Sequence, residues 1–275
     1  MDFSLSEDQH AIAELAQKIF DNQVTDAAQA AQHEYFDVAL WRTLAQAGLA
    51  GVGLSEANGG SGMGFVAQCL VLKPMGTVLA HIPLLETLLA AQVLDDAGIN
   101  DALAQVCAGQ THLSLSLADG LTLDGDNTVS GELMMVPYAA GAQYIVVQAN
   151  GKLLAVSPDS SAVTLIPQHV SNGRPTFMVS FNAAPCTVLG DADAIARLQQ
   201  RQQVATAMVQ LGVAEEALRR TALYTTERTQ FGKPIAAFQA VAHRAANAYI
   251  DVEALRGAID GAMWRLENGA DASLQ

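Results

Sequence analysis

The sequence predicts an α+β protein of several domains: an N-terminal helical domain, a small antiparallel β domain, and an incomplete C-terminal helical bundle of two long helices. Three observations predict it. Apolar residues recur at helical spacing over residues 1–112, short alternating segments divided by Asp-Gly, Asn-Gly and Pro fill residues 113–188, and long helical patterns fill residues 189–275. We expect domain boundaries at those positions. A chain of 275 residues is long enough for two or three domains and a sizeable core.

The N-terminal domain should begin with a helix whose start is marked by a capping box. Ser6 is followed three places later by Gln9, so each side chain can bond the backbone N–H of the other residue. A second helix should end at Gly48. The glycine-rich segment 51–64 lacks the Lys-Ser/Thr ending of a phosphate loop and follows no clear strand, which favours a structural turn. Further helices are expected over residues 65–79 and 84–97.

Residues 113–188 carry the β pattern. The segments HLSLSLA, NTVSGELMMVP, QYIVVQANGKLLAVSP, VTLIPQHV and PTFMVSFNAAP are short, partly alternating and rich in β-branched residues. Asn150-Gly151 lies between two apolar runs and is a strong signal for a two-residue hairpin turn. Met134 and Met135 are expected to fill gaps in the core.

The C-terminal region should form one helix over about residues 193–226 and a second over about residues 237–267. At a rise of 1.5 Å per residue each helix is about 45 Å long. We expect that two helices cannot cover their apolar stripes on each other alone, and that the chain is not a stable monomer. The stripe of the second helix steps by three and four residues through Phe238, Val241, Ala245, Ala248, Val252, Leu255, Ile259, Ala262 and Leu266.

Composition excludes several classes of protein. The formal net charge of −14 and the pI of about 4.6 argue against nucleic-acid binding, because a phosphate backbone would be repelled. Three scattered cysteines without a CxxC pair indicate a reducing compartment, with no disulfide framework and no metal site. No apolar run reaches the length of a membrane span, and the acidic start does not look like a secretory signal. A cytoplasmic enzyme or enzyme subunit is the expectation.

One short segment carries a family resemblance. Residues 228–239 read RTQFGKPIAAFQ, which resembles the signature Arg-x-Gln/Thr-Phe-Gly followed by Phe/His-Gln of the acyl-CoA dehydrogenase family. The lead-in LGVAEEALRRTALYTTE and the N-terminal GLAGVGLSEANGGSGMG also resemble that family, with Ser55-Glu56 in place of its usual Pro-Glu. The resemblance is loose over the whole chain and close over residues 212–266.

The resemblance implies a flavin adenine dinucleotide (FAD) site shared between subunits, in which the turn between the two long helices reaches into a neighbouring subunit. An arginine fork suits a pyrophosphate, and an aromatic ring can pack on a flat cofactor ring. Gly-Lys-Pro would end one helix and set the angle of the next. The alternative is a helix–helix corner whose arginine is merely solvated. The residues implied to contact the cofactor are Arg228, Gln230, Phe231, Ile235 and Gln239.

The chain departs from the family where the chemistry is expected. The position that resembles the catalytic glutamate of one branch of the family is Gln202, whose neutral amide cannot take a proton, so no catalytic base is assigned. In the other branch the glutamate lies beyond the last residue here. Glu215 and Glu216 are expected on a solvated face, although Glu215 or Asp193 would be the first alternative bases to test.

Two further departures concern a loop and the length of the chain. The Thr-Glu-Pro loop that usually holds flavin and substrate is absent from LADGLTLDGDNTVSG, and the C-terminal helical region is about half the family's usual length. These losses resemble the degenerate subunit of bacterial heteromeric acyl-CoA dehydrogenases, including those that degrade sterol side chains. The implied function is FAD-dependent dehydrogenation of an acyl-CoA thioester within a homo- or hetero-oligomer, with an electron-transfer flavoprotein as a further partner. The alternatives are a catalytically silent architectural subunit and a flavin-free acyl-CoA-binding protein.

Overall fold

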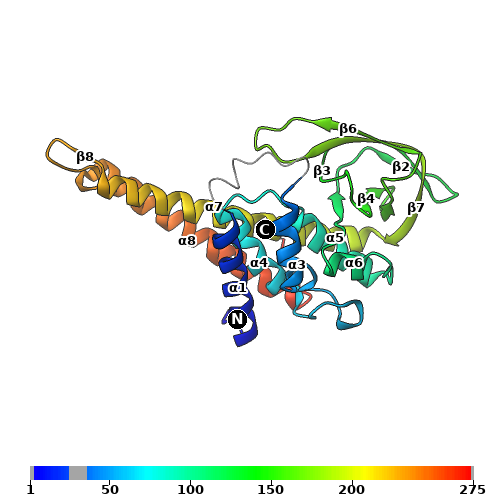
Figure 1. Ribbon diagram of the computed structural model, residues 1–275, viewed down its shortest axis with the longest axis horizontal. Helices are drawn as coiled ribbons and strands as arrows, with labels where there is room; N and C mark the ends of the chain where they lie inside the picture. Colours follow the sequence, from blue (N-terminus) through cyan, green and yellow to red (C-terminus); the bar gives the residue numbers. More distant parts are fainter. Residues whose placement is uncertain (1–2, 25–35, 274–275) are drawn as a thin grey trace.

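The computed structural model describes residues 3–24 and 36–273, and it confirms the predicted fold class. N-terminal helices and a curled β sheet lie along one part of a long helical hairpin, whose other part projects away from both (Figure 1). The predicted domain boundaries stay predictions. The N-terminal helices are α1 (Glu7–Gln23), α3 (Val38–Gln46), α4 (Gly64–Thr77), α5 (Leu84–Asp96) and α6 (Leu103–Cys107).

The predicted helix signals have the expected physical roles. The capping box is confirmed: the Gln9 N–H donates to Ser6 Oγ at 3.2 Å, and the Ser6 N–H donates to Gln9 Oε1 at 3.0 Å. Gly48 follows α3 with φ +77°, a left-handed conformation that ends the helix at little cost for glycine. The loop after Gly48 contains two short 3₁₀ turns, η1 (Leu49–Gly51) and η2 (Glu56–Asn58).

The glycine-rich loop is held by one carboxylate of α5. Asp95 accepts hydrogen bonds from the Ser55 N–H at 2.8 Å and the Ser55 hydroxyl at 3.0 Å. It also accepts one from the Asn58 amide at 2.6 Å. These donors are therefore committed to a partner within the chain, as a structural turn requires.

The β region is one seven-stranded sheet of order β1-β4-β5-β7-β3-β2, with β6 paired to β7. Every pairing is antiparallel except that of β1 with β4, which is parallel. The segment between those two strands leaves the sheet edge, forms β2 and β3 elsewhere in the sheet, and returns in the same direction. The strands are β1 (Ser114–Ser116), β2 (Leu121–Leu123), β3 (Thr128–Pro137), β4 (Ile145–Ala149), β5 (Lys152–Val156), β6 (Val163–Gln168) and β7 (Thr176–Gly190).

Two local features shape the sheet. The predicted hairpin turn is confirmed, because Asn150 and Gly151 have φ of 48° and 72° between the paired residues Ala149 and Lys152. Strand β7 is 15 residues long and pairs with β3, β5 and β6 along different parts of its length. The sheet curls around this strand, as Figure 1 shows.

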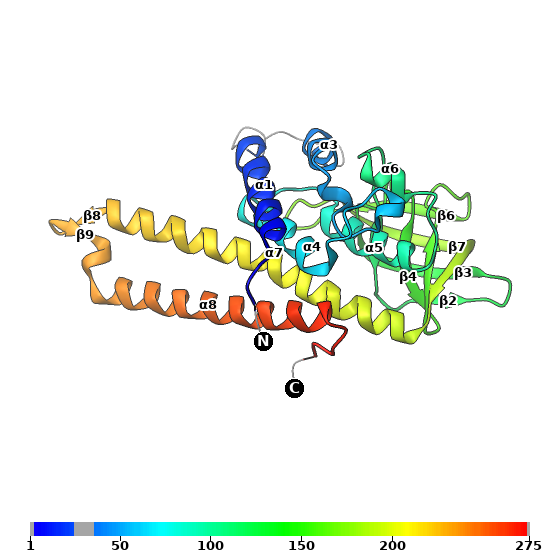
Figure 2. The same cartoon turned by 90° about the horizontal axis from the view of Figure 1, so that it is seen from below.

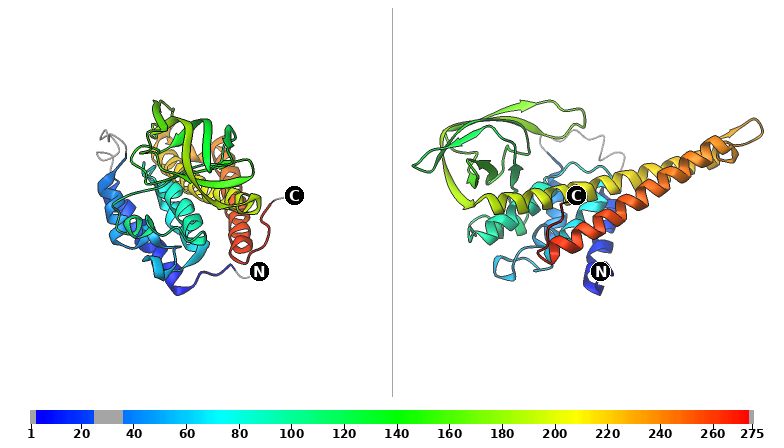
Figure 3. Two further views of the ribbon diagram at one scale, coloured as in Figure 1. Left: turned by 90° about the vertical axis from the view of Figure 1, so that its right-hand side faces the viewer. Right: turned by 180° about the vertical axis from the view of Figure 1, so that it is seen from behind.

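The long hairpin consists of α7 (Ala192–Glu227) and α8 (Gln239–Glu267). The 36 residues of α7 correspond to about 54 Å, longer than predicted. Helix α7 starts beside the sheet, and the tip of the hairpin lies at the opposite end of the molecule (Figures 2 and 3). We call residues 217–251 the arm; none of them is buried.

The predicted α8 stripe is covered, but α7 is not its only cover. All nine of its residues, from Phe238 to Leu266, are buried or half-buried, and α4 packs on α8 in addition to α7. Apolar side chains do remain exposed on the arm, but they lie outside that stripe. They are Leu223, Tyr224, Phe231, Tyr249 and Ile250.

The root of the hairpin is packed tightly on α4. A Cβ on Gly76 would lie 2.0 Å from the Val209 carbonyl oxygen, and one on Gly212 would lie 2.2 Å from the Lys73 carbonyl oxygen. The backbones of α4 and α7 are therefore in direct contact, which only glycine allows at both positions. The root is a fixed support for the arm.

Candidate cofactor-binding site

The signature residues form a tight turn at the tip of the arm. Helix α7 ends at Glu227, and the two-residue strands β8 (Thr229–Gln230) and β9 (Lys233–Pro234) pair on either side of Phe231 and Gly232. Both turn residues have positive φ, 52° and 78°, which is the pattern of a type I′ hairpin turn. Gly232 therefore serves this hairpin instead of ending the helix as expected.

Phe231 is the most unusual residue of the turn. Its side chain is 92% exposed, and its backbone is left-handed, a conformation that costs a non-glycine residue about 1–2 kcal/mol. Its ring meets that of Phe238 edge-on, with the ring centroids 6.2 Å apart. Lys233 Nζ lies 4.4 Å from the centroid of the Phe238 ring. A strained and exposed aromatic residue indicates a functional surface.

The other predicted cofactor residues lie at the same tip. Arg228 caps the end of α7, and its carbonyl oxygen accepts a hydrogen bond from the Ile235 N–H at 2.8 Å. Gln230 and Gln239 are exposed, whereas Ile235 is half-buried. Within residues 3–24 and 36–273, the Arg228 guanidinium makes no ion pair. The structure thus brings the five predicted residues together at one tip. The positively charged guanidinium of Arg228 is exposed to solvent there.

The residue predicted at the base position lies far from this tip. Gln202 is half-buried on the root of α7, and the 26 residues that separate it from Arg228 span about 39 Å of helix. The signature turn and Gln202 of one chain therefore cannot belong to one small-molecule site. The tip can take part in such a site only by reaching a different molecule.

Neither Glu215 nor Asp193, the two alternative bases, is placed as an obvious substitute for the missing catalytic glutamate. Glu215 is not on a solvated face as expected: its carboxylate lies 2.8 Å from both Lys73 Nζ and Arg256 Nη2, and so links α4, α7 and α8. Asp193 is exposed in the first turn of α7. The Glu267 carboxylate is also committed, because it accepts the Phe65 N–H at 2.8 Å at the start of α4.

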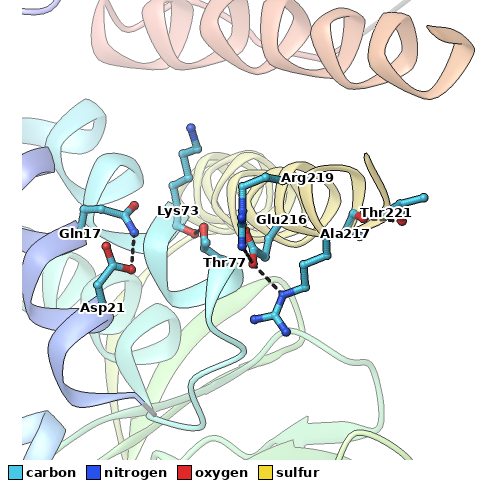
Figure 4. Close-up of polar contacts among 9 residues, drawn as sticks. Gln17, Asp21, Lys73, Thr77, Glu216, Ala217, Arg219 and Thr221 are labelled. Atoms are coloured by element: carbon cyan, nitrogen blue, oxygen red, sulfur yellow. Dashed lines mark hydrogen bonds and ion pairs between the residues drawn. The ribbon is translucent and has the colours of Figure 1, made fainter. Parts of the chain in front are cut away.

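A cleft of about 610 Å³ lies where the arm leaves the root, between α1, α4 and α7. Figure 4 shows Gln17 and Asp21 on one side, Lys73 and Thr77 in the middle, and Glu216 with Arg219 on α7. Glu216 accepts two bonds from Arg219, at 2.6 and 2.7 Å, and one from Arg220 at 2.6 Å. Chiefly through the bonds from Arg219, these guanidinium groups lower the pKa of Glu216 to about 2. In this cleft the Glu216 carboxylate is therefore already neutralised by Arg219 and Arg220 of the same helix.

Sequence reasoning missed an exposed apolar surface on the sheet. Met134 and Met135 were expected in the core, yet they are 55% and 53% exposed. They lie at a bulge in β3, where Met135 has φ +60° and its N–H donates to Gln168 Oε1 at 2.8 Å. Ile166 on β6 is 46% exposed. The signal was present in ELMMVP, where successive apolar residues break the alternation.

A second missed feature fixes the end of β3. Arg174 Nη2 lies 2.8 Å from Glu86 Oε1 of α5, and the Arg174 guanidinium lies 5.4 Å from the centroid of the Tyr138 ring. His112 Nε2 donates to the Tyr138 carbonyl oxygen at 2.9 Å. Glu86 is only 3% exposed; burial raises its pKa, and Arg174 partly offsets this effect. This pair, in which Glu86 is buried and Arg174 half-buried, joins the helices to the sheet.

Two features are absent from residues 3–24 and 36–273. No cluster of three or more His, Cys, Asp or Glu side chains there could hold a metal ion. No helix in that part of the chain is long and apolar enough to cross a membrane.

Comparisons with known proteins agree on one family. Residues 6–115 match the model of the acyl-CoA dehydrogenase N-terminal domain, and residues 193–275 match that of the C-terminal domain. The acyl-CoA dehydrogenase FadE27 of Mycobacterium tuberculosis is 29% identical, over 99% of this chain and 79% of the relative.

Two solved structures are similar over nearly the whole chain. The Tcur3481-Tcur3483 steroid ACAD is 35% identical with a TM-score of 0.91, over 97% of this chain and 80% of that one. The ChsE4-ChsE5 complex from Mycobacterium tuberculosis is 27% identical with a TM-score of 0.90, over 98% of this chain and 80% of that one.

Proposed function

The chain belongs to the acyl-CoA dehydrogenase family, and we propose that it is one subunit of a FAD-dependent assembly that oxidises the Cα–Cβ bond of an acyl-CoA thioester. An electron-transfer flavoprotein is the proposed electron acceptor. One observation carries the proposal. The guanidinium of Arg228, which has no ion-pair partner among the described residues, lies beside the strained and exposed Phe231 at the tip of an arm whose root is tightly packed. The tip would lend these contacts to a FAD held mainly by a neighbouring chain.

The residues at the tip fit this cofactor chemically. The planar guanidinium of Arg228 can donate two charge-assisted hydrogen bonds to a pyrophosphate. The exposed ring of Phe231 offers an aromatic face. The amides of Gln230 and Gln239 can each donate and accept, as neutral groups of a bound nucleotide require. When bound, FAD supplies the acceptor for the hydride that leaves Cβ.

Removal of the Cα proton is assigned to another chain. A proton acceptor must lie within hydrogen-bond reach of that carbon, and the Gln202 amide cannot accept the proton. Glu215 is held between Lys73 and Arg256. We therefore propose that a partner chain provides the carboxylate and that this chain orients the cofactor. An architectural subunit that does no chemistry at its own site is the second candidate, and the glutamine at position 202 favours it.

Substrate and location are further parts of the proposal. One of the similar solved structures is described as a steroid ACAD, which supports a sterol-derived acyl-CoA as the substrate. The cysteines Cys69, Cys107 and Cys186 are free thiols in the structure, which supports a reducing compartment such as the cytoplasm.

The flavin content of purified protein tests the proposal. The chain should be purified alone and after co-production with a full-length family member that has its own catalytic glutamate. We expect little flavin absorbance from the chain alone, and stoichiometric flavin with acyl-CoA-dependent bleaching from the complex. Flavin-free protein in both preparations, with acyl-CoA binding retained, would favour the flavin-free binding protein instead.

A further inference from the structure

Lys233 at the tip of the arm is not among the residues assigned to the cofactor contact, yet its side chain has a specific partner. The Lys233 Nζ atom lies 4.4 Å from the centroid of the Phe238 ring, within the range of a cation–π interaction. Lys233 belongs to β9, whereas Phe238 is the residue that caps the start of α8. The contact therefore ties the turn to the helix that follows it.

Phe238 is also the neighbour of Phe231. The two ring centroids lie 6.2 Å apart, and the ring planes are nearly perpendicular, at 83°. Phe231 is nevertheless 92% exposed, so this contact supports the ring without covering it. Perpendicular and offset-stacked arrangements are both favourable for a pair of aromatic rings. The pair alone therefore does not determine the perpendicular arrangement, which leaves the faces of Phe231 open.

The backbone of the tip places Lys233 where its side chain can make this choice. Lys233 pairs with Gln230 across the turn, and the Phe238 N–H donates to the Ile235 carbonyl oxygen at 3.1 Å. Backbone bonds thus hold both residues while their side chains meet. An ammonium group that lies over the Phe238 ring hinders the Phe231 ring from stacking on that face.

We propose that Lys233 is a positioning residue for the cofactor contact: it holds the Phe238 ring, and that ring keeps Phe231 in the orientation that presents an open aromatic face. This inference rests on the proposed function and adds to it a residue that acts without touching the cofactor. Loss of the ammonium group would free one face of Phe238. Phe231 would then stack on that face, because an exposed aromatic ring gains free energy when its surface is removed from water.

A direct contact between the Lys233 ammonium group and a phosphate of FAD is the alternative explanation. Both explanations predict that loss of the positive charge weakens FAD binding, because charge-assisted hydrogen bonds to phosphate are strong. They differ in their dependence on Phe238. A positioning role disappears when the Phe238 ring is removed, whereas a direct contact persists.

The orientation of Phe231 can be measured in the full chain without FAD. With para-fluorophenylalanine at position 231, the fluorine NMR relaxation caused by a soluble gadolinium chelate reports how exposed this ring is. Lys233→Met removes the cation at similar length, Lys233→Arg keeps it, and Phe238→Leu removes the ring. Arg244→Met, an exposed position farther along α8, is the control for loss of one positive charge. Thermal unfolding confirms that each variant folds.

We expect Lys233→Met to lower the fluorine relaxation about twofold, because stacking hides one of the two ring faces. Lys233→Arg and Arg244→Met should match wild type. Lys233→Met combined with Phe238→Leu should return the relaxation to the wild-type level, because no ring remains on which Phe231 can stack.

FAD titration of the complex with a full-length family member gives the second measurement. Lys233→Met should weaken FAD affinity by about 2–5-fold, the effect of an exposed cation–π contact, whereas Lys233→Arg and Arg244→Met should keep wild-type affinity. In the Phe238→Leu background, Lys233→Met should cause no further loss, because residues that act as one unit are not additive.

Three results would overturn the proposal. They are unchanged fluorine relaxation in Lys233→Met, FAD affinity as weak in Lys233→Arg as in Lys233→Met, and an undiminished effect of Lys233→Met in the Phe238→Leu background. The last result would assign a direct phosphate contact. Failure of the proposed function is distinguishable, because Arg228→Ala would then leave FAD affinity at the wild-type level while the fluorine measurement in the free chain stays the same.

Discussion

The root and the arm of the hairpin are built from the same two helices, yet their surroundings differ in every respect. At the root, Gly76 and Gly212 allow backbone contact between α4 and α7, and Glu215 joins Lys73 to Arg256. On the arm no residue is buried, and the most exposed large apolar side chain, Phe231, sits in a left-handed conformation. The difference teaches that the root serves stability, whereas the strained and exposed turn of the arm contributes little to stability and is where we propose the cofactor contact.

Turnover gives the largest expected effect. The isolated chain should show background activity with any acyl-CoA and an artificial electron acceptor, because general-base catalysis is worth about 10²–10⁴-fold and Gln202 provides none. Activity should appear in a complex with a full-length partner that has its own glutamate. Gln202→Glu in the isolated chain should restore at most a trace. Robust turnover by the unmodified chain would show that another carboxylate acts as the base, with Glu215 and Asp193 the first to test.

The largest stability effect should come from the Glu86–Arg174 pair. Arg174→Met leaves the buried Glu86 carboxylate without its partner, which should lower the free energy of unfolding by about 2–4 kcal/mol at neutral pH, less than for a fully buried pair because the Arg174 side chain is 35% exposed. Arg220→Met removes a 70% exposed partner of Glu216 and should change stability little. Urea denaturation of both variants measures the difference.

The pH dependence of the Arg174→Met variant has a defined sign. The pKa of Glu86 is raised in the folded protein, so folding takes up a proton between the unfolded and the folded pKa. Stability contributed by this group therefore falls as pH rises through that interval. Without Arg174 the loss should be greatest at neutral pH and smaller at about pH 5, where more of the carboxyl is protonated. A loss independent of pH would show that packing, and not charge, is responsible.

Glycine substitutions on the two sides of the hairpin should have opposite signs. Gly212→Ala places a methyl group against the Lys73 carbonyl and should cost about 1–3 kcal/mol of stability. Gly257→Ala on α8 meets nothing within 4 Å and should stabilise by about 0.5–1 kcal/mol through helix propensity. Thermal unfolding of the two variants checks this, and a destabilised Gly257→Ala would show that this part of α8 is packed more tightly than the structure indicates.

The smallest stability effect is expected at the tip. Phe231→Asn places a residue that tolerates the left-handed conformation before Gly232, the pair preferred in type I′ turns, and should stabilise by about 1 kcal/mol or less. The same change should weaken flavin retention in the complex, because the aromatic face is lost. Retention equal to wild type would remove Phe231 from the proposed contact.

Local patterns in the sequence predicted much of this fold. The capping box at Ser6, the turn at Asn150-Gly151 and the stripe on α8 are signals between near neighbours in the chain, and the structure confirms the first two directly. The Glu86–Arg174 pair joins residues 88 positions apart, so no periodicity reveals it. The parallel pairing of β1 with β4 is likewise a long-range choice.

The candidate site could be predicted only in part. The signature placed Arg228, Phe231 and Gln239 at one turn, because they are neighbours in the chain. The separation of that turn from Gln202 follows from the unbroken length of α7. The exposure of Met134 and Met135 depends on what the sheet packs against, which the local pattern does not specify.

Flavin affinity of the assembled complex tests the central claim most directly. Arg228→Ala should weaken FAD binding by about 10–100-fold, the effect of losing a charge-assisted contact. Arg219→Ala is the matched control, nine residues earlier on α7 with its guanidinium held by Glu216, and it should retain wild-type affinity. Equal affinity of the two variants, in complexes of equal stoichiometry, would contradict the claim that the tip of the arm contacts the cofactor of a neighbouring chain.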